Sequence, residues 1–179
     1  MSKNKTIAIC AGHSDTDPGA VNGTRTEAQI VLDMRKMVAH YLTLDGIKHE
    51  TDGKGGVNQP LAQTIKVAQA CDIAIEFHCN AAANKAATGV EVLSANKNKA
   101  LAQKLASAIH KHLGIPLRGD KGWKSEGSGQ HSRLGFISKG GGLIVELFFI
   151  SNNADLAKWD SKKWLVAKEV AAVLMQEAT

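Results

Sequence analysis

The chain contains few cysteine, proline and aromatic residues. Its three cysteines, Cys10, Cys71 and Cys79, show no C-x-x-C spacing, which argues against both a disulfide framework and a cysteine-rich zinc finger. We expect these thiols to be reduced. Aromatic residues make up 4% of the 179 residues, so the core must consist mainly of valine, isoleucine, leucine and alanine. The three prolines lie near predicted turns, and without repeats or a linker we expect residues 1–179 to form a single domain.

Long apolar runs are also missing. No run approaches the length of a transmembrane helix, and the N-terminal stretch MSKNKTIAIC lacks the apolar segment of a secretion signal. We therefore expect no signal peptide, synthesis in a cytoplasm and no stable insertion into a membrane. The formal net charge of +5 suits an anionic polymer such as nucleic acid, cell-wall material or a membrane surface, but it does not choose among them.

Predicted strands alternate with predicted helices along the chain. Strands are expected at 5–12, 47–51, 73–78, 89–95 and 141–151, and helices at 28–44, 59–70, 97–113 and 161–177. This order is typical of an α/β fold, and we predict a mostly parallel, twisted sheet of about six strands with helices on both faces. Ligands of such sheets bind outside the carboxyl ends of the strands.

Three predicted strand ends carry polar residues that a core would exclude. They are AGHSDTDPGA, FHCNAA and VELFFISNN, which contain His13, His78 and Glu146 respectively. His13 could equally be a surface residue of its loop, and His78 could be a satisfied core histidine. Neighbouring residues of a strand point to opposite faces, so His78 and Cys79 cannot both serve one site. We interpret Cys79 as a small packed side chain.

Two glutamates add carboxylates to these histidines. Glu27 opens the first long helix, where Thr24 could pair with it in a capping box. However, Thr26 and Gln29 have the same spacing and would leave Glu27 free to point elsewhere. Glu146 interrupts a buried strand, which is costly unless its carboxylate is paired with an arginine, protonated or part of a metal site.

Imidazole and carboxylate groups without clustered thiolates suit a catalytic zinc ion. Such a site has three protein ligands and one open position for water. The fourth group, a carboxylate, would then accept a proton from that water as a general base. No single spacing in this chain is diagnostic of the site, whereas the combination is.

Four sequence blocks carry a family resemblance. AGHSDTDPGA followed by Glu27, then FHCNAA, GVEVLSA and LIVELFFISNNAD, resemble in order the GHGG-x-DPGA, S-x-H-x-NA, GVE and VE-x-GF-x-SN motifs of the Amidase_3 type of N-acetylmuramoyl-L-alanine amidases. The resemblance implies one zinc ion held by His13, Glu27 and His78, with Glu146 as the catalytic glutamate. It also implies cleavage of the amide between N-acetylmuramic acid and L-alanine of peptidoglycan.

Several residues are candidates for substrate contact. Asn80, beside the metal strand, could donate a hydrogen bond to substrate or make a structural bond to the backbone. His131 and Arg133 lie in a long polar loop and could meet a substrate carboxylate, while Trp123 could stack on a sugar or pack. Phe148 replaces a family glycine, and its spacing from Glu146 predicts that it shares the same sheet face and narrows the site.

The resemblance also suggests a biological setting. A compact, basic amidase domain without a separate wall-binding domain or a signal is similar to a bacteriophage endolysin. Such an enzyme waits in the host cytoplasm and then acts on peptidoglycan in the periplasm. We expect a monomer that binds peptidoglycan and not nucleic acid. A bacterial wall-remodelling amidase, another zinc peptidase or carboxypeptidase, and a non-catalytic binding module remain alternatives.

Overall fold

The core of the molecule is a six-stranded sheet. The computed structural model describes residues 5–128 and 134–179. The strands lie in the order β4 (His49–Thr51), β1 (Ile7–Ala11), β5 (Ile73–Asn80), β8 (Leu143–Phe149), β6 (Glu91–Ser94) and β7 (Trp123–Ser125). Only the pairing of β6 with β8 is antiparallel among these neighbours. The predicted mostly parallel α/β sheet is confirmed.

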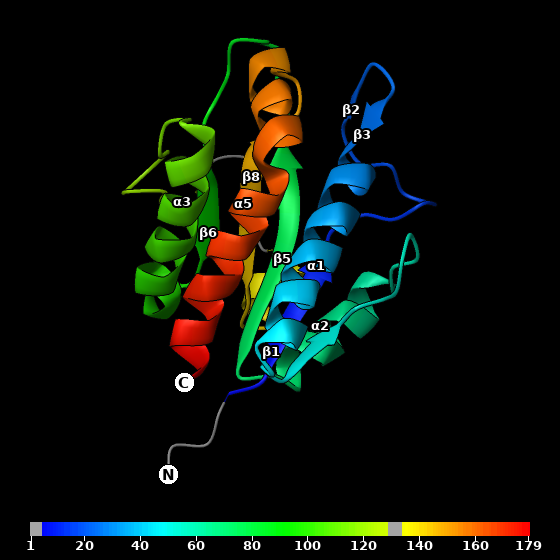
Figure 1. Ribbon diagram of the computed structural model, residues 1–179, viewed down its shortest axis with the longest axis vertical. Helices are drawn as coiled ribbons and strands as arrows, with labels where there is room; N and C mark the ends of the chain where they lie inside the picture. Colours follow the sequence, from blue (N-terminus) through cyan, green and yellow to red (C-terminus); the bar gives the residue numbers. More distant parts are fainter. Residues whose placement is uncertain (1–4, 129–133) are drawn as a thin grey trace.

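Helices cover both faces of the sheet. One face carries α1 (Glu27–Leu44), α3 (Lys99–Leu113) and α5 (Asn153–Ala178), which lie side by side across the strands (Figure 1). The other face carries α2 (Leu61–Gln69) and the short α4 (Gly135–Ser138). A 3-10 turn (Asn96–Asn98) precedes α3, and a small hairpin of β2 (Val21–Asn22) and β3 (Arg25–Thr26) precedes α1.

The two apolar clusters follow the alternation of side chains along the central strands. In β8, Val145 belongs to the larger cluster under α1, α3 and α5, whereas Ile144 belongs to the smaller cluster under α2 and α4. The second face is covered by fewer residues than the first. Its uncovered part, near the carboxyl ends of β1 and β5, is where the polar strand ends meet.

The alternation breaks in β8 just after Glu146. His78 pairs with Glu146, and the next pairing joins Asn80 to Phe149, so β8 contains one residue more than β5 over this interval. Such a bulge re-aims the residues that follow it. Phe148 consequently stacks on Trp159 of α5, with ring centroids 5.7 Å apart. The prediction that Phe148 shares the face of Glu146 and narrows the site was therefore wrong.

Within the described residues, none of the helices combines the length and the hydropathy that a membrane-spanning helix requires.

Candidate metal centre and active site

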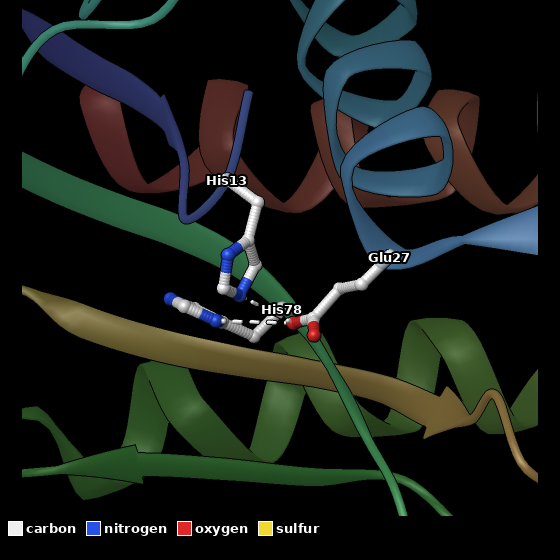
Figure 2. A group of neighbouring side chains, drawn as sticks. All are labelled: His13, Glu27 and His78. Carbon is white, nitrogen blue, oxygen red and sulfur yellow. Dashed lines mark hydrogen bonds and ion pairs between the residues drawn. The ribbon is translucent and has the colours of Figure 1, made fainter. Parts of the chain in front are cut away.

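Glu27 is placed by the start of α1. Thr26 is the N-cap: its side chain accepts a hydrogen bond from the Gln29 backbone at 3.2 Å, and the Gln29 side chain accepts one from the Thr26 backbone at 3.1 Å. This is the capping box that leaves Glu27 free, as predicted. The Glu27 carboxylate is buried, and it points away from the helix axis toward two imidazole rings (Figure 2).

Two backbone amides fix the Glu27 carboxylate. Its Oε2 accepts a hydrogen bond from Ala20 N at 2.9 Å, and its Oε1 accepts one from Cys79 N at 2.8 Å. Burial by itself would raise the pKa of Glu27, but hydrogen bonds from His13 and His78 outweigh it and hold the pKa far below its ordinary value. Glu27 therefore stays an anion and a competent metal ligand.

His13 lies in the loop that follows β1. Its Nε2 is 3.2 Å from Glu27 Oε1, while its Nδ1 is 3.0 Å from Asp17 Oδ2. Burial lowers the pKa of His13, and the hydrogen bond with Glu27 reverses that effect and raises the pKa above its ordinary value. The ring is thus held between two carboxylates, with Nε2 facing the centre of the site.

His78 lies near the carboxyl end of β5. Its Nδ1 is 3.2 Å from Glu27 Oε1, and its ring centroid is 5.2 Å from that of His13, nearly perpendicular to it. One face of the ring rests on Gly12, where a Cβ atom would lie 2.0 Å from His78 Cε1. Only glycine leaves room for the ring at that position.

His13, Glu27 and His78 together form a group that could hold a metal ion. Each offers one ligand atom, and these atoms all lie within 4.8 Å of one another. Two imidazoles and one carboxylate are a donor set that zinc accepts, and three protein ligands leave a position open for water. The residues present therefore fit a catalytic zinc ion. The structure brings together the three residues proposed as ligands from the sequence.

Glu146 lies next to this group. It pairs in register with His78 across β5 and β8, so the two side chains lie on the same face of the sheet. Its Oε2 is buried and has no hydrogen-bond partner within the described residues. Burial raises the pKa of Glu146 to about 7. No arginine forms an ion pair with it in the described part of the chain, so the alternative of a buried Glu–Arg pair finds no support.

A cavity of about 530 Å³ opens beside these residues. Its lining joins the polar groups His13, His78, Glu76 and Glu146 with apolar side chains from α2 and α4. The cavity is therefore polar around His13, His78 and Glu146 and apolar along one wall.

The other predicted residues have different outcomes. Asn80 ends β5 and is not part of the cavity lining, so its contact with substrate stays a prediction. His131 and Arg133 lie outside the described residues. Trp123 packs beside α3: its Nε1 donates a hydrogen bond to Ser94 Oγ at 3.1 Å, and Lys99 Nζ lies 4.5 Å from the ring centroid.

Cys79 is a packed core residue, as predicted. Its side chain is 5% exposed and belongs to the larger apolar cluster, on the face opposite the site. Burial raises the pKa of the thiol well above its ordinary value, which leaves it a poor nucleophile.

Sequence reasoning missed a buried network that supports the His13 loop. Arg35 of α1 binds Asp52 at 2.9 Å, and Asp52 accepts a hydrogen bond from the backbone of Ala11. Arg35 also donates to Asn58 at 3.0 Å, and the Asn58 amide donates to the carbonyl oxygens of Ala11 and His13. The network connects the end of β1 to α1 and so fixes the position of the loop that carries His13.

Sequence reasoning also missed Glu76. It precedes His78 by two residues in β5, and its Oε2 is 3.1 Å from His78 Nε2. Because residues two apart on a strand share a face, the spacing alone could have identified it as a neighbour of His78.

Comparisons with known proteins agree with this geometry. The family model Amidase_3, described as N-acetylmuramoyl-L-alanine amidase, matches residues 7–176. A structure from Neisseria meningitidis, provisionally named an N-acetylmuramoyl-L-alanine amidase, is 47% identical, with a TM-score of 0.91 over 98% of this chain and 97% of that one. AmiC2 of Nostoc punctiforme, an N-acetylmuramoyl-L-alanine amidase, is 20% identical and has a TM-score of 0.84 over 99% and 98% of the two chains.

A curated relative is longer than this chain. The N-acetylmuramoyl-L-alanine amidase LytC of Bacillus subtilis is 26% identical over 185 residues, which cover 98% of this chain but only 35% of LytC. The match over nearly the whole of this chain, together with the site geometry, establishes the family. The chain belongs to the Amidase_3 family of N-acetylmuramoyl-L-alanine amidases.

Proposed function

We propose that this protein is a zinc-dependent peptidoglycan hydrolase that cleaves the amide between N-acetylmuramic acid and L-alanine. The observation that carries the proposal is the group of His13, Glu27 and His78, whose two histidines line the same cavity as Glu146. Within the described residues, Oε2 of Glu146 has no hydrogen-bond partner. Family membership supplies the substrate class.

His13, Glu27 and His78 would hold the zinc ion. Zinc at such a site supplies Lewis acidity, which polarises a carbonyl group and makes water acidic enough to lose a proton near neutral pH. The chain contributes the geometry: backbone amides fix Glu27, Asp17 orients His13, and Gly12 seats the ring of His78.

Glu146 would act as the general base and then as the general acid. Its Oε2 makes no hydrogen bond to any described residue, so it would be able to accept a proton from the attacking water. The same proton would pass to the amide nitrogen of L-alanine as the carbon–nitrogen bond breaks. The products are then a glycan with an intact lactyl carboxylate and a peptide with a free amino terminus.

Variants of this glutamate and of the ligands test the proposal. Glu146→Gln should lose turnover of purified peptidoglycan by at least about 100-fold while keeping its fold and its zinc. His13→Ala should lose zinc as well. A Glu146→Gln protein with wild-type turnover would refute the role of Glu146, and unchanged zinc content in His13→Ala would refute the ligand set.

We further propose that the enzyme acts as a monomer in host-cell lysis, from a cytoplasmic store that reaches peptidoglycan after the inner membrane is breached. The net charge of +5 supports contact with an anionic wall. The fold is also similar to the catalytic domain of the CD27L endolysin, with a TM-score of 0.72 at 22% identity.

Expression with and without a membrane-permeabilising protein tests this setting. Lysis only in its presence is expected, and equal lysis in its absence would contradict a cytoplasmic store.

A further inference from the structure

Both ring nitrogens of His78 face carboxylates. Nδ1 is 3.2 Å from Glu27 Oε1, and Nε2 is 3.1 Å from Glu76 Oε2. Glu27 belongs to the proposed ligand group, whereas Glu76 lies on the opposite edge of the ring. One nitrogen of His78 therefore faces the metal position and the other faces a carboxylate that takes no part in that group.

Glu76 is buried, and among the described residues His78 is its one polar partner. It is 5% exposed, and its neighbours in register are Cys10 of β1 and Ile144 of β8. Within the described residues, its carboxylate makes no ion pair with a lysine or arginine, and its hydrogen bond goes to His78 alone. A buried carboxylate with a single polar partner is costly, so the contact needs a reason beyond packing.

The ring of His78 has close contacts on several sides. Gly12 lies against its face, and both nitrogens are held by glutamates from different elements, α1 and β5. A neutral imidazole carries one N–H, and the nitrogen that donates it cannot bind a metal. The position of the N–H therefore decides which nitrogen is available.

We propose that Glu76 is a positioning residue that accepts the Nε2–H of His78 and so leaves Nδ1 as the nitrogen that would bind the metal beside His13 and Glu27. This role rests on the proposed zinc site. The family motif S-x-H-x-NA has serine at the place of Glu76, so the resemblance does not imply a carboxylate here. Carboxylates that hydrogen-bond to a metal-ligating histidine fix its tautomer and increase its basicity, and their loss typically costs about 10- to 100-fold in metal affinity.

Zinc affinity tests this role without depending on catalysis. The full chain, stripped of metal, would be titrated with zinc in competition with a chromophoric chelator. Titrations at pH 8 and at pH 9 would separate the competition between protons and zinc for the ligand atoms from the effect of ligand orientation. We expect Glu76→Ser to weaken zinc binding about 10- to 100-fold. Glu76→Gln should weaken it less, because its amide oxygen can accept the same hydrogen bond.

A matched control is available in Asp155. This carboxylate is 2% exposed at the start of α5 and binds Thr88, away from the cavity. Asp155→Asn should bind zinc as the wild type does. The absorption spectrum of bound cobalt provides a second measurement, since a misoriented His78 changes the ligand field in the Glu76 variants and not in the control.

The outcomes separate this role from the proposed function. If the wild type binds zinc and Glu76→Ser binds it equally well, the proposed role of Glu76 is refuted, whereas the proposed zinc site is supported. If the wild type binds no zinc, both are wrong. Should Glu76→Ser fail to fold, Glu76→Gln decides: weaker binding than the control supports the role, and binding equal to the control overturns it.

Discussion

Glu146 should destabilise the metal-free protein in a pH-dependent way, and Glu146→Gln should remove this effect. The carboxyl group is buried at 6% exposure, and its Oε2 lacks a hydrogen-bond partner in the described residues. Glutamine has nearly the same shape and no charge. The substitution therefore resembles a permanently protonated Glu146.

The sign and size of the effect follow from the pKa of Glu146. Burial raises this pKa from 4.5 to about 7 in the folded state. The folded protein keeps the proton up to about pH 7, whereas the unfolded chain releases it near pH 4.5. Rising pH between these values therefore lowers the free energy of unfolding. At about 1.4 kcal/mol per pKa unit, the loss reaches about 3 kcal/mol above pH 7 and is about 1 kcal/mol at pH 5.

Urea denaturation of the metal-free proteins at pH 5 and pH 8 measures this difference. Glu146→Gln should be more stable than the wild type by about 3 kcal/mol at pH 8 and by about 1 kcal/mol at pH 5. A gain that is equal at both pH values, or a loss at pH 8, would refute the conclusion that Glu146 is buried without a compensating partner.

Glu91 is the matched control, because it pairs in register with Glu146 on the neighbouring strand β6. Burial would raise the pKa of Glu91, but Lys124 and Arg118, at 2.7 and 2.6 Å, hold it below its ordinary value. Its charge therefore stabilises the fold above about pH 4.5, and this contribution is lost as the pH falls through the lowered pKa. Glu91→Gln should accordingly destabilise the protein at pH 8, opposite in sign to Glu146→Gln.

Three further substitutions test parts of the site. Gly12→Ala should displace His78 and weaken zinc binding more than about tenfold in a folded protein, because ligand geometry sets affinity; a zinc titration with wild-type affinity would contradict this packing. Cys79→Ser should keep hydrolysis of purified peptidoglycan within about twofold at a stability cost of about 1 kcal/mol, and a folded but inactive variant would overturn the packed-residue assignment. Arg35→Met leaves Asp52 buried without its ion pair and should cost about 3–5 kcal/mol in urea denaturation; a cost below about 1 kcal/mol would show that Asp52 finds another partner.

The elements with strong local signals were predictable from the sequence. The start of α1 is an example, because the capping box of Thr26 and Gln29 is a local pattern that also frees Glu27. The buried strands β1, β5 and β8 are largely apolar, and each lies within about two residues of its predicted range. Helix α5 begins at Asn153, earlier than predicted, because Asn152 caps it there. The prediction missed this start because the first turns of the helix lack a clear apolar period.

Features that depend on pairing between distant segments were not predictable. Phe148 faces α5 because β8 contains an extra residue relative to β5, and only the pairing of the two strands reveals this bulge. The network of Arg35, Asp52 and Asn58 joins α1 to the loop after β4, so no local pattern signals it. The convergence of His13, Glu27 and His78, in contrast, follows from the rule that parallel strands gather their carboxyl ends at one edge.

The central claim is that a zinc ion held by this chain cleaves the bond between N-acetylmuramic acid and L-alanine. The most direct measurement combines metal analysis of the purified protein with mass spectrometry of digested peptidoglycan, before and after treatment with a chelator. We predict one zinc per chain, and products consisting of peptides with free amino-terminal L-alanine and glycan with intact muramic acid. Chelation should abolish these products and added zinc should restore them. Release of single amino acids alone, or unchanged digestion by a zinc-free protein, would contradict the account.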